Sequence, residues 1–171
     1  RQMCIRDRAQ LAPLRRDNQA APDARDPAAL IDHILTRYHA VHREQLPELV
    51  RMARRVEAVH RDHPAAPHGL AELLETMEVE LLDHMEKEEE VLFPALEQAQ
   101  SGVEGPIGVM RDEHTGHGAL LERLSALTGD HTPPMGACNT WRALYAGTAQ
   151  LTEDLISHIH LENNLLFLSL I

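Results

Sequence analysis

The sequence is poor in aromatic residues and in cysteine. Only five of its 171 residues are aromatic, and its two cysteines are Cys4 and Cys138. Two cysteines do not make the disulfide framework of a small secreted domain, so we expect a reducing, cytoplasmic setting. No histidine or aspartate that would activate Cys138 is evident in the sequence around it, so we interpret this residue as buried rather than nucleophilic. No apolar run approaches the ~20 residues of a membrane span.

Positive charge is also scarce. Sixteen Lys and Arg residues stand against 27 Asp and Glu, which gives a formal net charge of −11. This balance argues against nucleic acid or an anionic membrane as the main partner. The length fits one domain. We expect that domain over residues 27–171, preceded by a linker or arm at 1–26 that is either an assembly scar or the remnant of a missing N-terminal module. The residue in excess is histidine, which occurs twelve times.

Four segments have apolar residues at helical spacing, and no segment shows the alternation of a strand. Breaks rich in proline and glycine separate them. The expected helices cover residues 27–63, 70–98, 106–127 and 135–168. Pro47 lies inside the first helix and should kink it. Four long helices joined by short loops predict an all-α fold, an antiparallel up-down four-helix bundle.

The second and fourth expected helices share the motif His-x-x-x-Glu-x-x-x-Leu-Phe. It begins at His84 and, 74 residues later, at His158. Residues four apart lie on one face of a helix. Each histidine and the glutamate of its own motif, Glu88 or Glu162, can therefore contact the same small ligand. We interpret residues 86–90 otherwise as a solvated acidic face. Helical bundles build dinuclear iron or manganese centres from such inward His and Glu pairs.

The first and third expected helices share His-x-x-His-x-x-x-Leu. This motif begins at His39 and, 75 residues later, at His114. The predicted metal ligands are His39, His84, Glu88, His114, His158 and Glu162. No catalytic residue beyond this site is predicted. The alternative is a duplicated helix pair whose histidines only cap helices or form ion pairs.

Four further side chains are candidates to support or gate the metal site. They are Glu80, Glu113, His60 and His117. His42, the counterpart of His117, either supports the ligands or completes a coordination sphere. His60 lies 21 residues after His39, about 31 Å along a straight helix, so the two cannot bind one site unless the helix breaks.

Taken together, these motifs resemble the hemerythrin-like domain and, more closely, the di-iron family for repair of iron–sulfur clusters. The resemblance covers about residues 28–167 and includes the segments Arg37-Tyr-His39, His84-Met-Glu-Lys-Glu88, Met110-x-x-Glu-His114 and Leu161-Glu-Asn-Asn-x-Leu-Phe167. The family implies a bundle around two non-haem irons with an oxo or hydroxo bridge, in which Glu88 and Glu162 are the bridging carboxylates. The ligand types alone suit manganese as well.

The chain departs from the family pattern in three ways. It has no Cys-Cys pair of the kind the family usually carries in an N-terminal module, Thr115 stands where aspartate is common, and residues 168–171 replace the usual proline and basic residue.

The resemblance implies repair of iron–sulfur clusters damaged by nitrosative or oxidative stress, through iron donation or handling of nitric oxide. Damaged iron–sulfur proteins and the diatomic molecules NO and O2 are the implied partners, and the chain is expected as a monomer or homodimer. A module that binds or senses O2 or NO without turnover is the alternative. If the chain is an enzyme, its chemistry is nitric oxide reduction or a ferroxidase-like reaction.

Overall fold

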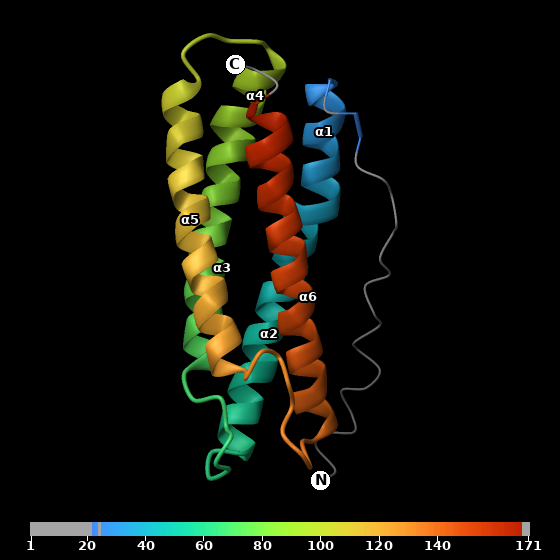
Figure 1. Cartoon of the computed structure of the whole chain (residues 1–171), viewed down its shortest axis with the longest axis vertical. Coiled ribbons are helices and arrows are strands. Elements are labelled where there is room, and N and C mark those ends of the chain that lie inside the picture. The colour runs from blue at the N-terminus through green and yellow to red at the C-terminus, as the bar shows by residue number, and fades with distance from the viewer. Residues whose placement is uncertain (1–21, 24, 169–171) are drawn as a thin grey trace.

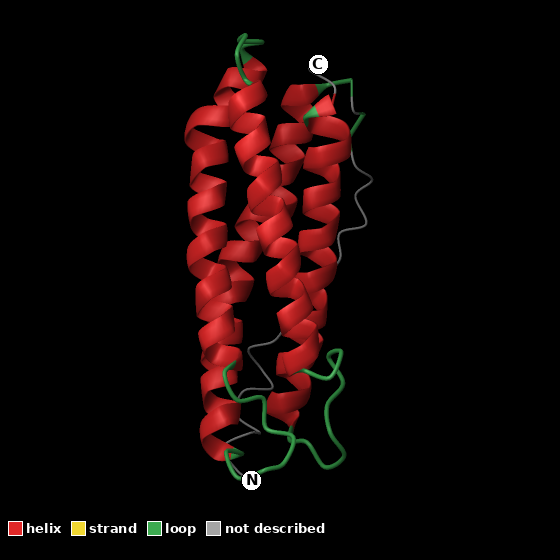
Figure 2. Cartoon of the chain, turned by 60° about the vertical axis from the view of Figure 1, so that its left-hand side comes forward, coloured by secondary structure: helices red, strands yellow, loops and turns green. Residues whose placement is uncertain are grey.

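A computed structural model describes residues 22–23 and 25–168 of the chain. Most of the expected arm at 1–26, and Cys4 with it, lies outside the described residues. Within them the chain is all-helical, without a strand (Figure 2). None of the helices described is both long enough and apolar enough to cross a membrane.

The helices group into four rods. The first rod consists of α1 (Pro27–Ile34), the π-helical turn η3 (Leu35–His39) and α2 (Ala40–Val59). The second consists of α3 (Leu70–Lys87), the π-helical turn η4 (Glu88–Leu92) and α4 (Phe93–Glu97). The third is α5 (Glu104–Leu127), and the fourth combines α6 (Asn139–Leu161) with the π-helical turn η5 (Glu162–Leu166). In Figure 1 consecutive rods run in opposite directions along one bundle.

The ends of the rods have local causes. Asp26 caps α1 by accepting a hydrogen bond from the Ala29 N–H at 3.1 Å, and a proline follows as the first helical residue. The first rod was expected to reach residue 63, but it ends at Val59 because His60 leaves helical geometry (φ −111°, ψ 22°). The fourth begins at Asn139 rather than at 135, since Gly136 adopts a positive φ of 81° that a helix does not use. Pro47 lies within α2 without ending it.

The core consists of two apolar clusters with a polar layer between them. The larger cluster surrounds the fully buried Trp141 in the half of the bundle that holds most of α2, α3 and α6. The smaller contains Phe93 and Phe167 and lies toward α1 and α4. Eight of the buried polar residues fall between these clusters: His39, His42, His84, Glu88, His114, His117, His158 and Glu162.

Candidate metal centre

Each of the four rods contributes one histidine to the polar layer. His39 ends η3, His84 belongs to α3, His114 to α5 and His158 to α6. All four are at most 4% exposed. The structure thus brings together four residues that span 120 positions of the sequence.

Two carboxylates lie among these imidazoles. Glu88 and Glu162 are fully buried and are the first residues of η4 and η5. Within each repeated motif the pair is close. His84 Nε2 lies 3.1 Å from Glu88 Oε1, and His158 Nε2 lies 3.0 Å from Glu162 Oε1. The i, i+4 spacing read from the sequence therefore does place each histidine beside its glutamate.

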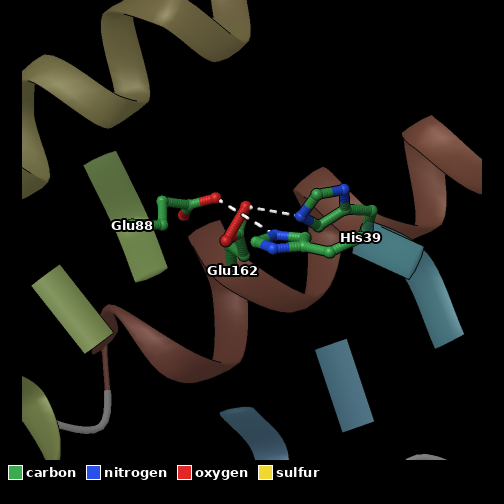
Figure 3. Close-up of side chains that lie close together, drawn as sticks. His39, Glu88 and Glu162 are labelled. Atoms are coloured by element: carbon green, nitrogen blue, oxygen red, sulfur yellow. Dashed lines mark ion pairs between the residues drawn. The ribbon is translucent and has the colours of Figure 1, made fainter. Parts of the chain in front are cut away.

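The other two histidines approach the same carboxylates from neighbouring rods. His39 Nε2 lies 3.4 Å from Glu88 Oε1, and His114 Nε2 lies 3.1 Å from Glu162 Oε1. Figure 3 shows the carboxylates of Glu88 and Glu162 converging near the imidazole of His39. Each carboxylate is thus contacted both by the histidine of its own motif and by a histidine from another rod.

The six side chains form two groups that can each hold a cation. The first consists of His39, Glu88, His158 and Glu162, and the second of His84, Glu88, His114 and Glu162; within each group the ligand atoms lie within 4.8 Å of one another. Both glutamates belong to both groups. The arrangement therefore offers two adjacent metal positions that share two carboxylates.

The hydrogen bonds of two histidines indicate that a cation fits between them. His84 Nδ1 faces a carboxylate oxygen of Glu113 at 3.4 Å, and His114 Nδ1 faces the amide oxygen of Asn163 at 2.8 Å. Because Nδ1 donates its N–H to an oxygen acceptor, the Nε2 atom of a neutral imidazole carries a lone pair. The two Nε2 atoms are only 3.1 Å apart. Two lone pairs at this distance repel each other unless a positive ion lies near both.

Unpaired polar atoms support the same conclusion. His39 Nε2, His158 Nε2, both carboxylate oxygens of Glu88 and Glu162 Oε2 are buried without a hydrogen-bond partner. Buried polar atoms in proteins are nearly always hydrogen-bonded, and buried charges are paired or coordinate metals. The residues present therefore fit a metal centre.

Burial and neighbouring charges shift the ionisation of this layer. Burial raises the pKa of Glu88 well above its usual range, and the nearby Glu162 carboxylate adds to the effect. Burial also acts to raise the pKa of Glu162, but the charge of His158 and the close polar contacts with Glu88, His114 and His158 outweigh it and hold that pKa well below its usual range. Burial, reinforced by His158, lowers the pKa of His39 to about 4. Without a cation the layer thus holds His39 as a neutral imidazole and Glu88 as a protonated carboxyl group.

Glu89 supports His39, which corrects the sequence-based interpretation that only Glu88 of residues 86–90 points inward. Its carboxylate lies 2.7 Å from His39 Nδ1 and pairs with both terminal nitrogens of Arg43 at 2.8 and 2.9 Å. The repeated His-x-x-x-Glu motif indicates this contact, because the residue after the glutamate has the same role in both copies. Asn163 follows Glu162 as Glu89 follows Glu88, and it contacts His114 as Glu89 contacts His39.

The π-helical turns explain how two successive residues can both face the site. Such a turn inserts one extra residue and is frequent at functional sites. The N–H of Phe93 donates to the Glu88 carbonyl, and the N–H of Phe167 donates to the Glu162 carbonyl, each five residues back. Phe93 consequently stacks on His39 with ring centroids 5.6 Å apart. Helical periodicity in the sequence does not predict these turns.

The four supporting candidates separate into two pairs. Glu113 contacts His84, as described, and the buried His117 lies edge-on to His84 with ring centroids 5.0 Å apart. Glu80, in contrast, is exposed on α3. His60 contacts Cys138 and Trp141 instead of the metal layer. The structure therefore brings Glu113 and His117 to the site and does not bring Glu80 or His60 there.

His42 begins a chain of polar contacts behind His158. Its Nε2 lies 3.1 Å from His158 Nδ1, and its Nδ1 lies 3.4 Å from the side-chain oxygen of Gln45. Gln45 in turn donates to Asp154 at 2.9 Å, and Arg37 pairs with the same carboxylate at 3.0 Å. His42 thus contacts a predicted ligand and is held by a chain that ends at an ion pair.

Comparison with known families agrees with this geometry. The family model of the hemerythrin HHE cation binding domain matches residues 30–168. The chain belongs to this family. The match confirms the hemerythrin-like resemblance inferred from the sequence, and its cation-binding description fits the buried His and Glu layer.

Within the hemerythrin HHE family, the chain is similar to curated iron-sulfur cluster repair proteins. The chain is 53% identical over 156 residues to the iron-sulfur cluster repair protein YtfE of Cronobacter sakazakii, covering 91% of this chain and 69% of the relative. It is 51% identical over 162 residues to the protein of the same name from Yersinia pseudotuberculosis serotype O:1b, covering 93% and 73%. For the Escherichia coli O157:H7 protein of that name the identity is 49% over 156 residues, covering 91% and 69%.

Proposed function

We propose that this chain holds two non-haem irons and acts in the repair of iron–sulfur clusters damaged by nitrosative or oxidative stress. The observation that carries the proposal is the pair of four-residue groups that share Glu88 and Glu162. The name of the curated relatives supports it, because they are called iron–sulfur cluster repair proteins and are about half identical to this chain over most of its length.

The six proposed ligands divide between the two ions. His39 and His158 would hold one iron, His84 and His114 the other, and the two glutamates would bind both. When bound, the irons supply a redox-active and exchangeable metal centre. Six protein ligands leave coordination positions open on two ions, where NO or O2 would bind.

The protein's own residues orient the ligands and keep water away from them. Glu89 and Asn163 fix the rings of His39 and His114 through Nδ1, so that Nε2 faces the ions. The phenyl ring of Phe167 lies parallel to His114, with ring centroids 6.1 Å apart, and is fully buried. These contacts orient both imidazoles without help from an ion.

Glu88 would take up a proton when an iron leaves. Burial and the Glu162 carboxylate raise its pKa well above the usual range in the metal-free site. A proton on a Glu88 carboxylate oxygen replaces positive charge that is lost with the ion, so the emptied site need not hold two unpaired buried carboxylates. Donation of iron and uptake of protons are therefore linked in the proposed mechanism.

Glu113 marks the side from which an ion would enter or leave. Its side chain is 24% exposed, it contacts His84 Nδ1, and the largely solvent-facing Lys87 pairs with it at 3.3 Å. A carboxylate that touches both a ligand and the surface can attract a cation and pass it inward.

A binding or sensing module for O2 or NO is the second candidate. The observation that favours it is the enclosure of the site, since the six proposed ligands are at most 4% exposed and Phe93, Phe167 and Tyr38 are buried beside them. A closed, partly aromatic site admits a diatomic molecule more readily than a larger substrate. The cytoplasmic location and the monomeric or homodimeric state remain predictions.

Iron transfer separates the two functions. The metal-loaded protein is mixed with an apo iron–sulfur protein under reducing conditions, and iron is measured in both after separation. Donation predicts that iron moves to the acceptor and rebuilds its cluster, whereas a carrier keeps its iron and binds NO or O2 reversibly. Glu113→Gln should slow the transfer, and Glu80→Gln, which changes an exposed carboxylate on α3, is the matched control. Metal analysis of the purified protein distinguishes iron from manganese.

A further inference from the structure

A thiol and an imidazole meet at the end of the bundle away from α1 and α4. The connections 60–69 and 128–138 both lie at this end (Figure 1). His60, at the start of the first connection, has its Nε2 atom 3.3 Å from Cys138 Sγ, at the end of the second. Both residues are half-buried and so are partly exposed to solvent. This corrects the interpretation of Cys138 as a buried residue without an activating neighbour.

The surroundings of Cys138 favour a negative charge on its sulfur. Cys138 is the N-cap of α6, a helix of 23 residues, and it keeps extended geometry (φ −71°, ψ 168°). The positive end of a helix dipole stabilises an anion at this position. Arg142, in the first turn of α6, donates from Nε to the carbonyl of Ala137, the neighbour of Cys138, at 3.1 Å. Reactive cysteines occur in such electropositive and partly exposed surroundings.

Aromatic rings also lie beside this pair. The His60 ring lies 5.0 Å from the Trp141 ring, and His63 meets the same indole edge-on at 5.1 Å. The imidazole of His60 is thus in contact with the thiol, and a second imidazole, that of His63, lies against the same indole. Among the described residues, groups of three or more metal-ligating side chains occur only in the polar layer and not here. Covalent chemistry at sulfur is consequently favoured over binding of a structural metal.

We propose that Cys138 is a reactive thiol that forms a mixed disulfide with low-molecular-weight disulfides, with His60 as its base. The Sγ–H proton passes to His60 Nε2, and the thiolate attacks one sulfur of the disulfide. A new sulfur–sulfur bond forms as the old one breaks, and the departing thiolate recovers the proton from His60. Cys138 is oxidised, and half of the incoming disulfide is reduced to a thiol.

This site is independent of the metal layer and goes beyond the proposed function. His158 lies 20 residues after Cys138 along α6. In a helix this separation corresponds to about 30 Å. A covalent group on Cys138 therefore does not reach the irons. It contacts the surroundings of Trp141, the chain's one tryptophan, whose fluorescence can report the reaction.

The test uses the iron-loaded full chain with the substitution Cys4→Ser, so that Cys138 is its one thiol. Oxidised glutathione is the probe, and mass spectrometry with tryptophan fluorescence follows the modification across pH. We expect one glutathionyl group per chain, removed by dithiothreitol. The rate should reach half its maximum at least one pH unit below the ~8.5 of an ordinary thiol. His60→Gln should move this midpoint up by about one unit, and the matched control His68→Gln, an exposed histidine of the same connection, should leave it in place.

Three results would overturn the proposal. One is a midpoint at or above 8.5 in the parent protein. Another is a midpoint that His60→Gln does not move, with helix content unchanged by circular dichroism. The third is a thiol that reacts only after the protein is unfolded in urea. Loss of iron transfer, in contrast, would affect the proposed function and not this inference.

Discussion

Replacement of Glu162 by glutamine tests the shared-carboxylate arrangement most directly. Its carboxylate lies 3.0 Å from His158 Nε2 and 3.1 Å from His114 Nε2. These histidines belong to different groups of proposed ligands. Glu162→Gln therefore removes one charged ligand from both metal positions, whereas His39→Gln removes a neutral ligand from one position only.

The expected metal content follows from this sharing. Each position has four candidate ligands, two imidazoles and two carboxylates. Loss of Glu162 leaves three at both positions and a single carboxylate, Glu88, to balance the charge of two cations. We expect iron to fall from about two per chain to one or none. In His39→Gln the group of His84 and His114 stays complete, so about one iron should remain.

The assay is iron per chain, measured by inductively coupled plasma mass spectrometry after loading and gel filtration. His131→Ala is the control, because His131 bonds to Thr148 outside the metal layer, at 2.8 Å, and this variant should retain two irons. Circular dichroism of the metal-free variants checks that all of them keep their helices. Retention of two irons in Glu162→Gln would refute the assignment of this carboxylate to both positions.

Three further predictions concern the surroundings of the site. Burial and the imidazole of His84 lower the pKa of His117 to about 3, so its stabilising contribution is present above pH 6.5 and is lost as the pH falls. In urea titrations, metal-free His117→Gln should lose about 2–3 kcal/mol less stability than wild type between pH 6.5 and 4.5; equal losses would contradict the shift. Glu89→Gln should weaken the metal position of His39 by about 10–100-fold and spare the other, which would make a metal titration biphasic; a single unchanged phase would count against the contact. Phe167→Ala should reduce the free energy of unfolding by about 3–5 kcal/mol in urea, because this fully buried ring leaves a cavity beside the site; a loss under 1 kcal/mol would show that the neighbouring residues refill it.

Helical periodicity was sufficient to predict the fold class and the approximate ends of the helices. Asp26 followed by Pro27 predicted the start of α1, and the described chain begins its first helix there. The ends at Val59 and Asn139 differed from prediction by four residues each. Apolar spacing continues beyond these points, and it carries no information about the backbone angles of His60 or Gly136 that end regular helix geometry.

The repeat was the most informative feature for the site. Its fixed spacing placed four histidines and two glutamates in register, and the structure brings all six side chains into one buried layer. Glu89 was misjudged because an α-helix would turn it away from the position of Glu88. The π-helical turn η4 adds a residue at this point, and a hydrophobicity pattern does not reveal such a turn.

The sequence by itself determined which residue types repeat and on which helical face they lie, because these properties depend on local spacing within each helix. Only the tertiary structure decided which side chains of different rods are in contact. It brought Glu89 to His39 and Asn163 to His114, and the first helical rod extends past the metal layer to the other end of the bundle, where His60 lies. There the fold joins His60 to Cys138, 78 positions away in the chain. Contacts between distant segments depend on how the rods pack and where their connections end, which spacing within one helix cannot specify.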